Sequence, residues 1–66
     1  MKLSEKIKLY RLENKMTQDE FAEAGGLTRV SVQAIENGRI ENPQMETLIG
    51  ISRAMNISID ELVKEE

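Results

Sequence analysis

The sequence predicts an all-α protein, a compact bundle of five short helices. Residue types that begin helices, such as Thr17 and Ser58, stand ahead of short segments, and types that end them, such as Gly26 and Gly38, stand after. Apolar residues between these signals follow the three- and four-residue spacing of one helical face. The 66 residues make one domain, residues 1–66, which is too small for a large enzyme cleft.

The first helix is expected to begin with Ser4 as its cap and to run to about Asn14. Its apolar face comprises Leu3, Ile7 and Tyr10, and its basic face comprises Lys6 and Lys8. Leu9 and Leu12 lie beside the apolar stripe. Two interpretations stay open for this pair, partial burial against the C-terminal segment or a surface for a dimer or another partner.

A second helix is expected to begin near Gln18. Thr17 followed by Glu20 is a capping-box signature, in which each side chain satisfies a backbone donor at the start of a helix. Gly25 and Gly26 then end the helix, because glycine reaches the left-handed conformation of a sharp helix exit without the steric cost of a β-carbon.

The third helix follows almost at once, with Thr28 as its cap. Val32 and Ile35 share one apolar face, and Gly38 after Asn37 ends the helix. Two helices joined by so few residues cross at a steep angle. The second and third helices therefore have the outline of a helix-turn-helix motif.

The fourth helix is expected over about residues 44–55, after a loop. Asn42 is its predicted cap and Pro43 suits its first turn, where no backbone donor is needed. The residues at helical spacing in this segment are Leu48, Ile51 and Met55. Asn56 provides a left-handed exit.

A short fifth helix is expected to run through Val63. Ser58 with Glu61 forms another capping box at its start. Acidic residues here, such as Asp60, are therefore explained by the start of a helix rather than by an active site.

The composition excludes several classes of chemistry. The chain has no cysteine and no histidine, so disulfides, thiolate chemistry, histidine-based acid–base catalysis and the usual metal sites are not expected. We expect no cofactor and no enzymatic activity. No stretch approaches the roughly 20 apolar residues that span a bilayer, and the N-terminus lacks a signal-peptide core. The expected location is the cytoplasm.

The net charge of −3 at first argues against a nucleic-acid partner, because Lys and Arg neutralise phosphates in such complexes. The charge is segregated, however. Residues 1–15 hold five basic and two acidic side chains, whereas residues 54–66 hold one basic and four acidic. A small DNA reader with few phosphate contacts binds weakly as a monomer, so a dimer is expected.

These residues together resemble the Cro and phage-repressor type (Xre-like) helix-turn-helix family of transcriptional regulators. The elements that carry the resemblance are Thr17-Gln18, Phe21-Ala22, Gly26, Thr28-Arg29 and residues 35–38. It continues through Pro43 and the later apolar series, and covers residues 3–63. The resemblance implies a lambda-repressor-like DNA-binding domain that binds a palindromic duplex operator as a homodimer, most often as a repressor.

A recognition helix in the major groove reads bases with side chains of its N-terminal half. With Val32 and Ile35 turned inward, the candidates for base contact are Arg29, Val30, Ser31, Gln33 and Ala34. Arginine binds guanine O6 and N7 or a phosphate, glutamine pairs with adenine, and valine or alanine touches a thymine methyl group.

The resemblance also implies roles outside the recognition helix. It places phosphate contacts at Gln18, Thr28, Asn37 and Arg39. For the last three the alternatives are a helix cap only, a helix terminator only and a solvated charge. It further implies a structural ion pair between Arg11 and Glu36, joining the first helix to the end of the third.

Two positions depart from the family pattern. Relatives usually place glycine where Lys15 stands, so Asn14 is the expected left-handed residue. Gly25 replaces a larger apolar residue, so either Leu27 fills the space or the helix ends early.

The homodimer is expected to use the fourth and fifth helices or the loop after Gly38. The candidate interface residues are Ile40, Ile49, Ile59 and Val63. The alternative function is an antitoxin or another regulator that binds a protein partner on the same fold, which the acidic C-terminal face and the weakly polar recognition helix favour.

Overall fold

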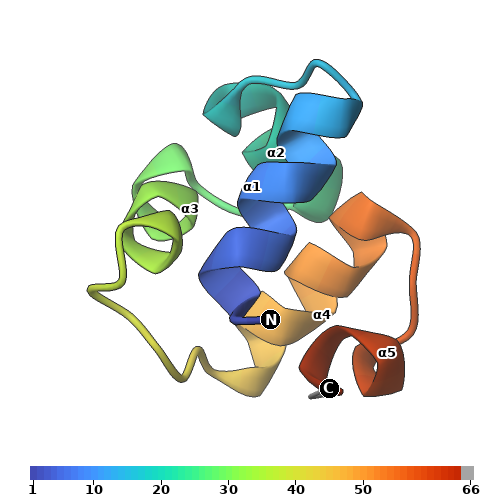
Figure 1. The fold of residues 1–66 in the computed structure, drawn as a ribbon. Coiled ribbons are helices and arrows are strands. Elements are labelled where there is room, and N and C mark those ends of the chain that lie inside the picture. Colours follow the sequence, from blue (N-terminus) through green and yellow to red (C-terminus); the bar gives the residue numbers. More distant parts are fainter. Residues whose placement is uncertain (65–66) are drawn as a thin grey trace.

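The computed structural model describes residues 1–64, and within that range every regular element is a helix (Figure 1). The five helices are α1 (Leu3–Glu13), α2 (Gln18–Gly25), α3 (Arg29–Glu36), α4 (Met45–Met55) and α5 (Ile59–Val63). In Figure 1, α1 crosses the middle of the molecule, with α3 on one side of it and α4 and α5 on the other. The predicted fold class, an all-α bundle of five short helices, is confirmed.

Each helix contributes a side chain to a single apolar core. The buried apolar residues are Ile7, Phe21, Ala22, Val32, Ile35, Ile51, Ala54 and Leu62. Phe21 is the largest of them, and the ring of Tyr10 meets its ring edge-on, with centroids 6.2 Å apart. The inward faces predicted for α1, α3 and α4 from apolar spacing therefore meet around α2.

Four of the helices end in the same way, with one residue in the left-handed conformation. In each case two backbone N–H groups beyond the helix donate to carbonyls of its last turn, as in a Schellman motif. The left-handed residues are Lys15, Gly26, Gly38 and Asn56. The sequence predicts the last three correctly.

The expectation that Asn14 is left-handed is wrong. Asn14 has φ −104°, and Lys15 has φ +53°. The side-chain amide of Asn14 donates to the Tyr10 carbonyl oxygen (2.8 Å), and the Met16 N–H donates to the Arg11 carbonyl oxygen (2.8 Å). These bonds make Asn14 the last residue of the turn, so the left-handed position falls on Lys15.

Two predicted helix starts are also corrected. In α1 the cap position belongs to Lys2 rather than Ser4, because the Lys2 N–H donates to the carboxylate of Glu5 (2.9 Å) and the helix starts earlier. In α4 the cap position belongs to Gln44 rather than Asn42. The chain stays extended through Gln44, at φ −66° and ψ 161°, so Pro43 precedes the helix instead of lying in its first turn.

Close packing of α2 on α4 explains why position 25 is a glycine instead of the larger apolar residue of the family pattern. A β-carbon on Gly25 would collide with the carbonyl oxygen of Gly50, and one on Gly50 would lie 2.7 Å from the Gly25 oxygen. The helix continues through Gly25 and ends at Gly26. Leu27 packs against the core beside Gly50, so the two glycines bring the backbones of α2 and α4 into contact.

On the outer face of α1, the structure corrects two predictions, one for Lys6 and one for Leu9 and Leu12. The Lys6 ammonium donates to the carbonyl oxygens of Leu62 (2.6 Å) and Lys64 (2.8 Å), so it closes the C-terminal end of α5 rather than extending a basic face. Leu9 and Leu12 are 44% and 71% exposed, so their predicted partial burial is wrong. Their role as a partner surface stays a prediction.

Candidate nucleic-acid interface

The helix-turn-helix unit is held by side-chain caps at the starts of α2 and α3. Thr17 Oγ1 accepts from the Glu20 N–H (3.1 Å), and the Glu20 carboxylate accepts from the Thr17 N–H (2.8 Å), which completes the predicted capping box. Thr28 Oγ1 accepts from the Ser31 N–H (3.1 Å) at the start of α3. These bonds fix where each helix begins and so set the short turn between them.

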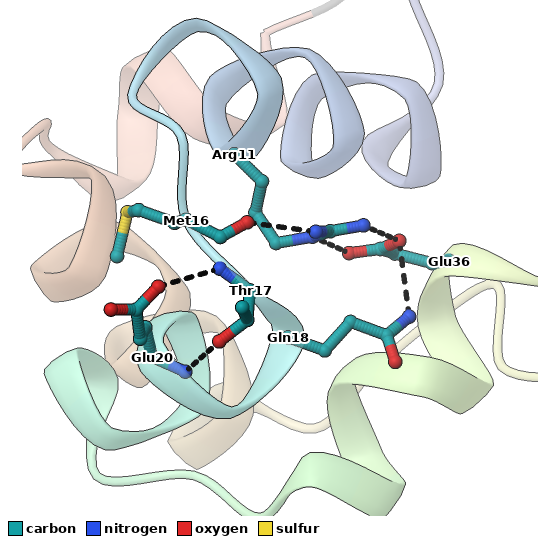
Figure 2. A network of polar contacts seen from close by, with 6 residues as sticks. All are labelled: Arg11, Met16, Thr17, Gln18, Glu20 and Glu36. Atoms are coloured by element: carbon teal, nitrogen blue, oxygen red, sulfur yellow. Dashed lines mark hydrogen bonds and ion pairs between the residues drawn. The ribbon is translucent and has the colours of Figure 1, made fainter.

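A polar network ties α3 to the two preceding helices (Figure 2). Arg11 donates from Nε to Glu36 Oε2 (2.6 Å) and from Nη2 to Glu36 Oε1 (2.8 Å), a bidentate ion pair. Arg11 Nη1 also donates to the carbonyl oxygen of Met16 (2.9 Å). From the start of α2, Gln18 Nε2 donates to Glu36 Oε1 (3.3 Å). One carboxylate at the end of α3 therefore binds side chains from α1 and α2.

Burial makes this network more important than a surface ion pair. The side chains of Arg11 and Glu36 are 17% and 4% exposed. The hydrogen bond with Glu36 raises the pKa of the Arg11 guanidinium; desolvation opposes this and the charge of Glu36 adds to it. A buried charge without its partner is strongly destabilising, so the network constrains the angle at which α3 lies on the body.

The outward side of α3 presents a mixed polar and apolar surface. Val32 and Ile35 are buried, as their spacing predicts. Among the candidates for base contact, Arg29, Val30 and Gln33 are exposed, whereas Ser31 and Ala34 are half-buried. Val30 is 74% exposed. All five lie outside the buried core, to which α3 contributes Val32 and Ile35.

Hydrogen bonds within the first turn of α3 engage part of this surface. The Thr28 hydroxyl donates to Ser31 Oγ (3.0 Å). Arg29 Nε lies 3.9 Å from Asp19 Oδ1 of α2, and both side chains are more than half exposed. The sequence does not reveal this second pair, because it depends on how α2 and α3 cross.

The four candidates for phosphate contact occupy the ends of α2 and α3. Gln18 opens α2 and is half-buried against Glu36, while Thr28 is exposed at the cap of α3. Asn37 follows α3, and its Oδ1 accepts from the Arg39 N–H (3.0 Å). Arg39 is exposed. The positions thus lie at both ends of the helix that carries the candidates for base contact.

The four candidates for a dimer interface fall into two groups. Ile40 and Val63 are 41% and 50% exposed, and both line a hollow of about 550 Å³ between the start of α1, the loop after α3 and α5. Ile49 on α4 is 39% exposed, whereas Ile59 on α5 is half-buried.

Within residues 1–64, no three acidic, histidine or cysteine side chains are grouped so that they could hold a metal ion. In the same range no helix has the length and hydropathy needed to cross a membrane.

Comparison with known proteins places the chain among helix-turn-helix regulators. The model of the family described as "Helix-turn-helix" matches residues 7–62. The chain is 41% identical over 63 residues to YqaE of Bacillus subtilis strain 168, an uncharacterized HTH-type transcriptional regulator, covering 96% of this chain and 53% of the relative. It is 36% identical over 66 residues to the immunity repressor protein of Bacillus phage phi105, covering 100% and 45%.

Two further matches cover most of the similar protein as well. The control protein C.SmaI of Serratia marcescens is 31% identical over 64 residues, which are 97% of this chain and 75% of that protein. The N-terminal DNA-binding domain of SinR from Bacillus subtilis superposes with a TM-score of 0.85 at 28% identity, covering 97% of this chain and 93% of that chain. The chain spans about half the length of YqaE and of the phage repressor.

Proposed function

This chain belongs to the helix-turn-helix family of DNA-binding transcriptional regulators, and from that premise we propose that it binds a palindromic DNA operator as a homodimer, with α3 in the major groove. The proposal includes repression as the regulatory outcome, in line with the name of the phage relative. The proposal includes the cytoplasm as the site of action, the location expected from the sequence.

The observation that carries the proposal is the two-sided character of α3. Its inner side chains Val32 and Ile35 are buried, and its outer side presents Arg29, Val30 and Gln33 to solvent. A recognition helix needs this division, because one side must rest on the body while the N-terminal half of the other meets base edges. Ser31 and Ala34 complete the base-reading surface.

Phosphate contacts position such a helix in the groove but do not read sequence. We assign them to Gln18, Thr28, Asn37 and Arg39, which lie at the ends of α2 and α3. Gln18 is supported by its hydrogen bond to Glu36, because that bond orients its amide relative to the recognition helix. Arg39 contributes the positive charge at the far end of α3.

A dimer compensates for the small number of basic contacts that one chain offers. Two copies related by a two-fold axis read half-sites whose centres are about 10 base pairs apart, one turn of DNA. For the interface we propose the surface formed by Ile40 and Val63, which line one hollow, together with Ile49 and Ile59.

A second function, binding of a protein partner as an antitoxin does, has one observation in its favour. Leu9 and Leu12 are exposed one turn apart on α1, on a chain with a net charge of −3. Such a surface is typical of sites that bind proteins. This function is compatible with DNA binding through α3, because the two surfaces use different helices.

Selection of binding sites from a random duplex pool at moderate salt tests the proposed function. The native chain should enrich a palindrome, and Arg29→Ala should alter the preferred base at one position in each half-site or lose the enrichment. Arg53→Ala, which removes an exposed arginine from α4, serves as the matched control and should select the native site. Failure to enrich any sequence at low salt would refute DNA reading by this chain.

A further inference from the structure

Val30 is an exposed apolar side chain at the position where a DNA reader needs chemical contacts. It is 74% exposed, more than any other large hydrophobic residue of the described chain. It lies in the first turn of α3, on the side opposite the buried Val32 and Ile35. On the surface proposed to read DNA, this apolar group is available for contact with an apolar part of a base edge.

The polar groups around Val30 are engaged with one another. Thr28 Oγ1 accepts from the Ser31 N–H and donates to Ser31 Oγ, and Arg29 lies beside Asp19. The isopropyl group of Val30 makes neither kind of bond, so contact with another apolar group is the interaction left to it. Ala34, four residues on, continues the same face and is small enough to leave space beside Val30.

The major groove offers one apolar group to such a side chain. Guanine, cytosine and adenine present hydrogen-bond donors and acceptors there, whereas thymine also presents its C5-methyl group. In uracil a hydrogen replaces this methyl group and the pairing is unchanged. Discrimination by an apolar side chain in this groove is therefore discrimination for thymine.

We infer that the isopropyl group of Val30 contacts the C5-methyl group of a thymine in each half-site, and so selects a T·A pair at that position. This inference rests on the proposed operator binding through α3. In this assignment Val30 recognises one base pair by apolar contact alone, whereas Arg29 recognises a base through hydrogen bonds. It also explains why the recognition helix presents apolar side chains, which cannot form hydrogen bonds with bases.

The test replaces each thymine of the selected operator by deoxyuridine, one position at a time, and measures affinity by fluorescence anisotropy at fixed salt. For the native chain, one position in each half-site should lose about fourfold in affinity, the factor that corresponds to one buried CH2 group. With Val30→Ala the same replacement should change affinity by less than about twofold, because the shorter side chain does not reach the methyl group.

The control variant is Glu23→Ala, which truncates an exposed side chain on α2 that belongs to none of the proposed contact surfaces and should keep the native sensitivity to deoxyuridine. Equal sensitivity of the native chain and Val30→Ala at every position would refute the thymine contact while leaving operator binding intact. A selected half-site without thymine would refute it as well. The absence of any selected site would refute the proposed function together with this inference.

Discussion

Replacement of Arg11 by methionine is predicted to destabilise the fold severely, through Glu36 rather than through lost packing. The methionine side chain keeps much of the volume but removes both hydrogen bonds to the carboxylate and the bond to Met16. Glu36 then stays 5% exposed with one donor, Gln18 at 3.3 Å. Loss of one partner from a buried pair typically costs about 3–5 kcal/mol.

That cost is large for a chain of this size. At roughly 0.05–0.15 kcal/mol per residue, a domain of this length has about 3–10 kcal/mol of stability. With a urea dependence of about 1 kcal/mol per molar, the loss corresponds to a midpoint shift of about 3 M or more. Equilibrium urea unfolding followed by circular dichroism at 222 nm measures this shift, and a variant that is unfolded without urea also agrees with the prediction.

Two further variants distinguish the effect of the buried ion pair from the effect of removing any charge. Asp19→Asn removes one partner of the exposed pair with Arg29, and its stability should change by less than about 1 kcal/mol. The double variant Arg11→Met, Glu36→Leu should recover part of the loss, because it leaves no unpaired buried charge. If Arg11→Met unfolds at the native urea midpoint, the reasoning that Glu36 depends on Arg11 is refuted.

Four other predictions follow from the structure. Gly25→Ala should lower the free energy of unfolding by about 1–3 kcal/mol, because its β-carbon collides with Gly50 of α4, and a native urea midpoint would contradict the close packing. Lys15→Gly should raise the free energy of unfolding by about 0.5–1 kcal/mol by relieving the positive φ, and urea midpoints that coincide would count against this. Arg39→Gln should weaken binding to selected and random DNA alike and reduce the slope of log affinity against log salt by about 1, and a sequence-dependent loss would speak for base contact instead. The pKa of the Arg11 guanidinium is raised in the fold. The stability that this charged group contributes is therefore complete below its unfolded pKa and declines only as pH rises through its folded pKa. Urea midpoints of the native chain and Arg11→Lys should accordingly differ by a constant amount between about pH 6 and 9.

The fold was predictable where its signals are local. A cap such as Thr17 or Thr28 satisfies backbone donors within three residues, so its effect is readable from the sequence alone. Gly26 and Gly38 are likewise readable, because few other residues adopt positive φ at low cost. The correct count and order of helices follow from these signals together with the apolar spacing.

The errors arose where a nonlocal or competing contact decides the outcome. Helical spacing predicts Lys6 on a basic face, but its partners are the carbonyls of residues 62 and 64, which only the fold brings near. Lys15 takes the left-handed position because Asn14 is bound to Tyr10, a preference that residue type does not reveal. The start of α4 shifted because the extended chain continues beyond Pro43.

The candidate interface was predictable in outline but not in its polar contacts. Periodicity separates Val32 and Ile35 from the outward residues of α3 without any structure. The approach of Asp19 to Arg29 and of Gln18 to Glu36 depends on the crossing angle of α2 and α3. Spacing in sequence carries no information on that angle beyond its being steep.

The most direct test of the central claim is a nuclear magnetic resonance titration of the isotope-labelled chain with its selected duplex. The account predicts that amide shift changes gather at the start of α2 and over residues 28–34 of α3, and that they saturate at two chains per palindrome. Shift changes confined to α4, α5 or the Leu9 and Leu12 surface would contradict it, because the DNA would then be bound by a face other than the recognition helix.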